Sequence, residues 1–326
     1  MKNRNFPRPN VIVSRCLGFD ACRYNDVTIA DDFVKQLAAH VTYLPVCPEV
    51  EIGLGAPRNP VRLVLRDDVV HLYQPATAAD VTEAMQTFSA TYLDAHPDVD
   101  GAILMGRSPS CGIKEVKIYA GMDKTASVRR KGAGMFAAAV HQRYAHLPVE
   151  ENVRLQNLIL REHFLTRLFA WADFRAVQVA GTMRELVRYH TENKLLLMVY
   201  NESRYRRMGP LVANHLKRPA AEVLAAYAEH LGVALAHPPR RTAGINGLMH
   251  ALGYFSEKLS AAEKAYFLDT LDQYRRSQVS LQVPVNLIGA WIARFGEPYL
   301  AQQTFFAPYP PDLLSLSDSG KGRAVE

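Results

Sequence analysis

The sequence predicts two domains of different fold class: an α/β domain with a parallel sheet and crossover helices, then an all-α domain. The chain has 326 residues, a length that suits two domains better than one. Short β-branched runs alternate with helical stretches in the first half, whereas the second half shows long helical patterns without convincing strands. The pattern changes near Leu147-Pro148, so we expect domains at residues 1–147 and 148–326.

The elements of the first half follow from short apolar runs. We expect strands at residues 10–13, 41–46 and 101–105, and helices at 31–40 and 79–95. Strands that alternate with helices form a parallel sheet, because each crossover returns the chain to the same edge.

Capping signals, glycines and prolines divide the second half into helices. Ser260 followed by Glu263 predicts a capping box at the start of a helix. Pro219 and the pair at 238–239 predict breaks, whereas Gly181 and Gly209 predict turns. These signals indicate an all-helical domain.

The formal charge of +6 is unevenly divided. Residues 1–150 hold 17 basic and 16 acidic residues, and residues 151–326 hold 21 and 16, so most of the excess lies in the second half. A basic excess weakly favours an anionic partner such as nucleic acid.

Nothing in the sequence indicates a membrane or export. No apolar run is long enough to span a bilayer, and the first residues, MKNRNFPRPN, lack the apolar stretch of a signal peptide. We therefore expect a cytoplasmic protein. In that reducing compartment, four scattered cysteines suit metal binding or catalysis better than disulfides.

Three of the cysteines follow predicted strands. Cys16, Cys47 and Cys111 each lie just beyond the carboxyl end of a strand, and those ends converge on one crevice in a parallel sheet. Soft thiolate ligands favour an iron-sulfur cluster or zinc, although three ordinary buried thiols are an alternative. Cys22 could be a fourth ligand, a sulfur acceptor or a bystander.

The motifs around these cysteines resemble those of the thiouracil desulfidase family, the TudS-like domains. They are CLG with CRYN within residues 16–25, CPEV at 47–50 and SPSCG at 108–112. The resemblance covers roughly residues 10 to 145. It implies a 4Fe-4S cluster held by Cys16, Cys47 and Cys111, with one open iron for the thiocarbonyl sulfur of a thiolated pyrimidine. It leaves Cys22 outside the ligand set, and Asp26 stands where the family commonly has glycine.

Replacing a C=S sulfur by oxygen requires a Lewis acid, an activated water and stabilisation of charge on the ring. Glu49 is the candidate acid or base, and Ser108 and Ser110 are candidates for hydrogen bonds to the base or the sulfur. The alternatives are a turn carboxylate for Glu49 and turn-capping hydroxyls for the serines.

Basic and aromatic residues near the first two motifs could bind substrate. Arg23, Tyr24 and Asn25 could hold the uracil edge or a phosphate, or form a solvated loop. Arg58 and Arg62 are candidate anion contacts on the same rim.

The second half resembles the YbgA-like domain over most of residues 150 to 312. The resemblance rests on the stretches at 190–198, 252–255, 272–276 and 283–284, although Asn193 and Tyr200 replace the usual histidines. Fusions of this kind resemble RNA desulfidases that convert 4-thiouridine, or 2-thiouridine, in tRNA to uridine. The helical domain would then bind RNA.

One basic cluster offers independent support for an RNA partner. Arg204, Arg206 and Arg207 lie among tyrosines, and arginine beside aromatic rings can contact phosphates and stack on bases. Basic residues on helices are also commonly just solvated. The alternatives to a tRNA enzyme are a desulfidase of free 2-thiouracil or a related small molecule, and a non-catalytic thiolated-RNA binder or cluster-carrying sensor. No DNA or membrane partner is expected.

Overall fold

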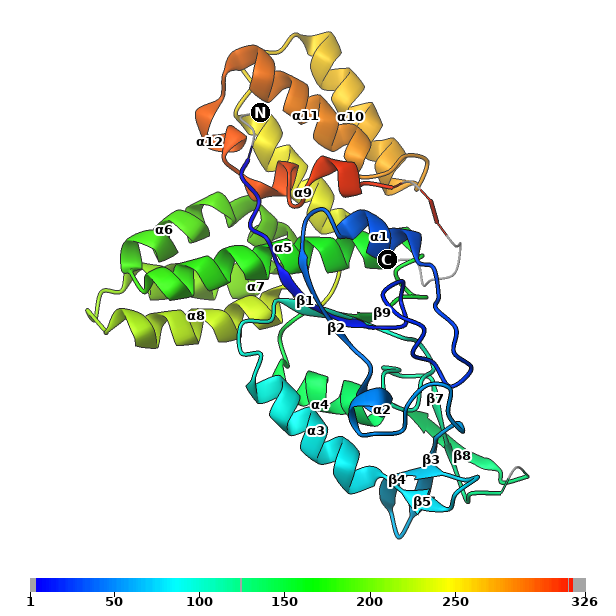
Figure 1. The fold of residues 1–326 in the computed structure, drawn as a ribbon. Coiled ribbons are helices and arrows are strands. Elements are labelled where there is room, and N and C mark those ends of the chain that lie inside the picture. The colour runs from blue at the N-terminus through cyan, green and yellow to red at the C-terminus, as the bar shows by residue number, and fades with distance from the viewer. Residues whose placement is uncertain (1–3, 124, 316, 319–326) are drawn as a thin grey trace. The chain divides into compact units, whose positions relative to one another are not determined.

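A four-stranded parallel sheet lies at the centre of the first half (Figure 1). Its order is β2-β1-β6-β9, and its strands are β1 (Asn10–Ser14), β2 (Thr42–Val46), β6 (Gly101–Leu104) and β9 (Val149–Glu151). The three expected strands are confirmed within one or two residues. β9 was not expected, and it pairs in parallel with β6.

A second, mixed sheet of five strands was also missed from the sequence. Its order is β5-β4-β3-β7-β8, and its strands are β3 (Arg62–Arg66), β4 (Val69–Gln74), β5 (Ala79–Asp80), β7 (Val116–Tyr119) and β8 (Val128–Gly132). β3 and β4 form a hairpin whose two loop residues, Asp67 and Asp68, have φ of 47° and 61°. Positive φ at both positions is the hairpin turn geometry that aspartate tolerates better than most residues.

Helices cover both faces of the parallel sheet. They are α1 (Asp32–Leu37), α2 (Pro48–Glu51), α3 (Thr82–Asp94), α4 (Met135–Arg143) and the start of α5 (Leu158–Ala180). Alternate β1 residues point to opposite faces, so Ile12 packs with Met85 of α3 and Phe136 of α4 in one apolar core. On the other face Phe33 of α1 meets Phe164 of α5, with ring centroids 6.5 Å apart. The expected helix at 79–95 begins only at Thr82, because residues 79–80 pair with β4.

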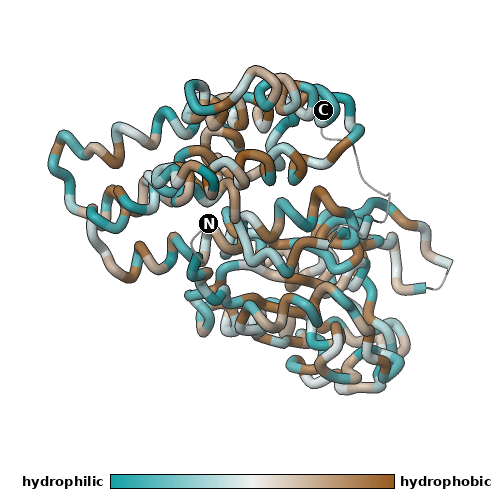
Figure 2. The backbone as a smooth tube through the Cα atoms, turned by 90° about the horizontal axis from the view of Figure 1, so that it is seen from above, coloured by the Kyte–Doolittle hydropathy of each residue, from teal (hydrophilic) through white to brown (hydrophobic). Residues whose placement is uncertain are grey.

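The second half is helical, as expected. Its elements are α6 (Met183–Glu192), α7 (Lys194–Ala213), α8 (Ala220–Ala234), α9 (Arg241–Gly253), α10 (Ala261–Arg275), α11 (Gln282–Phe295), α12 (Pro298–Ala301) and the 3-10 turns η1 (Thr304–Phe306) and η2 (Pro311–Leu313). Hydrophobic and hydrophilic residues are mixed along the helical stretches of the backbone (Figure 2), as expected of helices with one buried face. Phe255, Phe267 and Trp291 pack at the centre of its apolar core.

The local signals of the second half are largely confirmed. Ser260 and Glu263 form the capping box at the start of α10, and Pro219 is the N-cap of α8. Gly181 has a φ of 64° just after α5, as a turn glycine should. The turn expected at Gly209 is wrong, because that residue lies inside α7.

The structure describes residues 4–315 except 124, together with 317 and 318. By backbone contacts the chain divides into two units, one mainly of residues 8–172 and one mainly of residues 173–312. The boundary at residue 147 remains a prediction. Among the described residues, no helix combines the length and apolarity needed to cross a bilayer.

Candidate active site

The parallel sheet brings three cysteine loops to one edge. β1 pairs in parallel with both β2 and β6, so the carboxyl ends of these strands are neighbours. Cys16 follows β1, Cys47 follows β2 as the N-cap of α2, and Cys111 lies in the loop after β6. Their exposed fractions are only 8%, 9% and 6%. The sheet therefore places three buried thiols at one edge, as the strand-end argument predicts.

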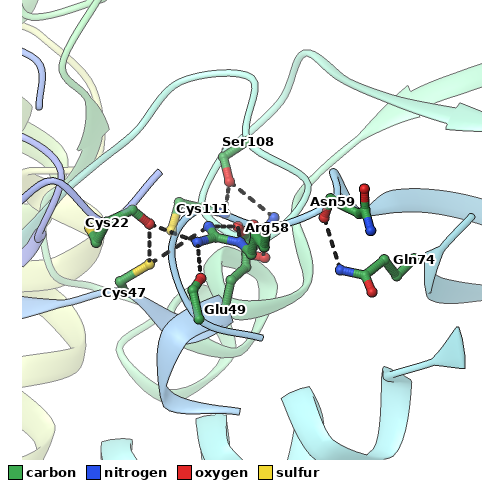
Figure 3. A network of polar contacts seen from close by, with 10 residues as sticks. Cys22, Cys47, Glu49, Arg58, Asn59, Gln74, Ser108 and Cys111 are labelled. Carbon is green, nitrogen blue, oxygen red and sulfur yellow. Dashed lines mark hydrogen bonds and ion pairs between the residues drawn. The ribbon is translucent and has the colours of Figure 1, made fainter. Parts of the chain in front are cut away.

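Cys22 lies among these thiols as well. It is 2% exposed, and its side chain is hydrogen-bonded to the thiols of both Cys16 and Cys47. The Cys47 thiol also donates to the Cys22 carbonyl oxygen at 3.5 Å (Figure 3). Cys111 interacts electrostatically with Cys47. All four cysteines are thus buried and linked by these interactions, and for Cys22 the sequence had left three roles open: a fourth ligand, a sulfur acceptor or a bystander.

Burial and hydrogen bonding raise the pKa of three of these thiols, Cys22, Cys47 and Cys111, in the metal-free chain. Hydrogen bonding to Cys16, with burial adding to it, raises the pKa of Cys22 to about 11. Burial raises the pKa of Cys111 to about 12, and hydrogen bonding to Cys22 followed by burial raises the pKa of Cys47. A bound metal supplies the positive charge that deprotonates a coordinating thiol, so the donor set fits a metal-sulfur cluster chemically.

The side-chain positions alone do not assemble a metal site in the described part of the chain. No group of three or more histidine, cysteine, aspartate or glutamate side chains in the described part of the chain is arranged to hold one. The ligand set of Cys16, Cys47 and Cys111 stays a prediction.

Glu49 and Ser110 form a buried pair beside the cysteines. Glu49 lies on α2, two residues after Cys47, and is 9% exposed. The hydroxyl of the fully buried Ser110 donates to Glu49 Oε1 at 2.7 Å. A helix and a loop far apart in sequence therefore meet in one carboxylate-hydroxyl contact, which can hold and transfer a proton.

Ser108 caps the turn that presents Cys111. Its hydroxyl oxygen accepts hydrogen bonds from the backbone N–H groups of Ser110 and Cys111, both at 3.2 Å (Figure 3). The Ser108 side chain is also hydrogen-bonded to the Cys111 thiol. Its contacts are thus those of a turn-capping residue next to a cysteine.

Three polar residues that hold the cysteine loops were not identified from the sequence. Ser14, 2% exposed at the end of β1, accepts from Met105 N at 2.8 Å and is hydrogen-bonded to the Cys111 thiol. Glu151 of β9 accepts from the N–H of Ile113 at 2.6 Å, and the neighbouring Asn152 accepts from Gly106 N at 3.2 Å. These contacts fix both ends of the loop that carries Cys111.

The loop after Cys22 is mostly exposed. Tyr24 is 45% exposed, and the Arg23 guanidinium lies 5.8 Å from the centre of its ring. Asn25 is exposed as well. Asp26 has a φ of 53°. Glycine adopts this left-handed conformation without strain, which gives a physical reason why glycine is common at this position in the resembled family.

The remaining predicted contact residues lie elsewhere. Arg62 donates to the Asp123 carbonyl oxygen at 2.7 Å and covers the Tyr119 ring, so its contacts lie on the mixed sheet and not at the cysteines. Arg204, Arg206 and Arg207 lie on α7 in the other unit. Arg206 forms an ion pair with Glu202 at 2.7 Å.

Four buried cysteines at the end of a parallel sheet, next to a buried Glu-Ser pair, define an α/β domain with a sulfur-lined site. The 2-thiouracil desulfurase family matches residues 11–152, which hold every one of these residues. A second family, described as a protein of unknown function (DUF1722), matches residues 194–310. The first half of the chain therefore belongs to the 2-thiouracil desulfurase family, and residues 194–310 of the second half match DUF1722.

The chain is also similar to two uncharacterized proteins and to one solved structure. The uncharacterized protein YbbK of Bacillus subtilis is 31% identical over 109 residues, covering 31% of this chain and 72% of that protein. The uncharacterized protein YbgA of Escherichia coli is 29% identical over 158 residues, covering 48% of this chain and 93% of that protein. A solved structure titled [4Fe-4S]-dependent thiouracil desulfidase TudS is 26% identical, covers 45% of this chain and 93% of its own, and has a TM-score of 0.34.

Proposed function

We propose that this protein is an iron-sulfur-dependent desulfidase that converts the C=S group of a thiouracil base to C=O. The observation that carries the proposal is the hydrogen bond between Ser110 and Glu49 beside four buried thiols. Membership of the 2-thiouracil desulfurase family over residues 11–152 supports it. The reaction consumes water and releases hydrogen sulfide, so it needs a proton carrier and an acceptor for sulfur but no oxidant.

The chain's own residues would supply the proton chemistry. Glu49 would take a proton from the attacking water and return it to the departing sulfur or a ring nitrogen. Ser110 fixes one carboxylate oxygen by its hydrogen bond at 2.7 Å, so the direction in which Glu49 accepts a proton is set before substrate binds.

Cys16, Cys47 and Cys111 would hold the 4Fe-4S cluster. With these three ligands, one iron of the bound cluster would remain open and would supply a Lewis acid for the thiocarbonyl sulfur. The three thiols are buried, and the turn capped by Ser108 holds Cys111 in place.

The proposal is tested with anaerobically purified, iron-loaded protein and 2-thiouracil. Uracil measured by liquid chromatography and mass spectrometry, and sulfide measured by colorimetry, should appear in equal amounts. The loaded protein should be brown, and metal-free protein should be inactive. A colourless preparation that turns over, or a fully loaded one that yields no uracil, would contradict the proposal.

A thiolated uridine in tRNA is a second candidate for the substrate, favoured by the arginines of α7. Arg207 is exposed, and Arg204 and Arg207 both lie close enough to His230 to lower its pKa, although burial contributes most to that shift. Arg204 and Arg207 therefore place positive charge where α7 and α8 pack together, beside Glu229 of α8. Phosphate groups would complement this charge.

We expect the triple variant R204A/R206A/R207A to bind bulk tRNA at least about 10-fold more weakly at low salt. The slope of log affinity against log salt should become shallower by about 2 to 3. The matched control is R275A/R276A, which removes charges already paired with Asp272. Equal tRNA affinity in both variants would rule out the arginine cluster as the RNA contact, and analysis of thiolated nucleosides before and after incubation would decide whether tRNA is a substrate at all.

A further inference from the structure

Arg58 is buried at the centre of the polar network that links the cysteines to Glu49 (Figure 3). Only 4% of its side chain is exposed. Its Nε donates to Glu49 Oε2 at 2.9 Å, and Nη2 forms a second contact with the same oxygen. The sequence predicted that Arg58 lies on the rim and binds an anion of the substrate. Its contacts are different, because its charge is paired with Glu49 inside the protein.

The rest of the guanidinium group is engaged too. Nη1 donates to the carbonyl oxygens of Cys22 at 2.7 Å and Gly55 at 2.8 Å, and Nη2 lies 3.9 Å from Cys47 Sγ. The backbone N–H of Arg58 donates to the Tyr24 carbonyl oxygen at 3.0 Å. One residue thus joins the loop of residues 22–24, the turn of residues 47–49 and its own loop.

These contacts fix the Glu49 carboxylate from two sides. Ser110 occupies Oε1 and Arg58 occupies Oε2, so rotating the carboxylate would break at least one hydrogen bond in a buried place. A guanidinium suits this task because its planar fork donates in several fixed directions at once. A lysine ammonium could not reach Glu49, the two carbonyl oxygens and the sulfur from one position.

We propose that Arg58 is the positioning residue of this site, which holds the Glu49 carboxylate in its reactive orientation and ties it to Cys47. This rests on the proposed function for its catalytic meaning, since Glu49 is the proton carrier there. Arg58 itself does not touch the reacting atoms. Its contribution to the reaction should appear in kcat, whereas a residue that only binds substrate would affect KM.

The test compares R58A and R58K with the wild type, and R66A is the matched control because Arg66 lies exposed on β3 beside Asp67. We expect both Arg58 variants to keep their iron and sulfide content and their KM for 2-thiouracil. Their kcat should fall about 10- to 100-fold, the range seen when the outer partners of metal sites are removed. Free guanidinium ion at millimolar concentration should restore part of the R58A activity.

A second measurement does not depend on activity. In the metal-free full-length chain, a water-soluble carbodiimide with an amine should couple to the Glu49 carboxyl group faster in R58A than in wild type, as read by peptide mass spectrometry. If R58A fails to fold, R58K carries the same test. An unchanged kcat, a rise in KM alone, or equal Glu49 labelling in all variants would overturn the proposal. Wild-type protein that is inactive on 2-thiouracil refutes the proposed function instead, and the labelling result still decides whether Arg58 positions Glu49.

Discussion

Glu49→Gln should lower kcat for 2-thiouracil by about 10²- to 10⁴-fold, the usual contribution of a positioned acid or base. Glutamine keeps the shape of the side chain, so it can still accept from Ser110 at the position of Oε1. It cannot take up the water proton, and it loses the charge that faces Arg58. Iron content should remain at the wild-type level, because no predicted ligand is changed.

The matched control for this substitution is Glu51→Gln on the same short helix. Glu51 pairs with Arg15, and its side chain is 36% exposed, so it lies outside the buried network. We expect its kcat within about 2-fold of wild type, since exposed ion pairs contribute little. If E49Q retained wild-type kcat, the carboxylate would have only the turn-stabilising role that is the alternative for this residue.

The strand ends that position the cysteines could be predicted because they depend on local pattern. Parallel strands appear as short apolar runs: β1 and β6 are buried ones, and β2 (TYLPV) is an edge strand that is mostly half-buried. Once three such strands alternate with helices, their carboxyl ends must share an edge. The thiols of Cys16, Cys47 and Cys111 could therefore be assigned to one place without coordinates.

The mixed sheet could have been found, and its signal was missed. Residues 62–74 contain two apolar runs separated by Asp67-Asp68, which form a two-residue hairpin loop. Asparagine-glycine or aspartate-glycine is the usual indication of such a loop, and two aspartates are a weaker one. At Gly209 a turn was predicted where none exists. The glycine lies inside α7, where neither its backbone nor its surroundings require a glycine, since a side chain there would meet only open space.

The contacts around Arg58 and Glu151 could not be predicted, because they depend on distant parts of the chain. Arg58 meets groups from three loops, and its inward orientation follows from the packing of all three. Glu151 lies beyond the predicted boundary at residue 147, yet it accepts from the N–H of Ile113 in the cysteine loop. Sequence pattern indicates where elements lie but not which buried polar groups will satisfy one another.

Replacing Cys111 by alanine should reduce bound iron to background and abolish desulfidase activity. Cys111 is buried, and it interacts with Cys47 and with the hydroxyl of Ser14. Removing its sulfur takes away one of three predicted ligands. Alanine fits the space left by the thiol, so loss of iron should not be accompanied by unfolding. The measurements are iron and acid-labile sulfide per chain, visible absorbance and thermal unfolding of the metal-free protein.

Cys22→Ala is the variant that separates the possible ligand sets. Cys22 is as buried as the other cysteines and is hydrogen-bonded to two of them, so its position alone does not exclude ligation. If three cysteines hold the cluster, C22A keeps its iron while C16A, C47A and C111A lose it. If C22A also loses its iron, four sulfurs close the cluster, no iron is open to the substrate, and the desulfidase chemistry proposed for this site fails with it.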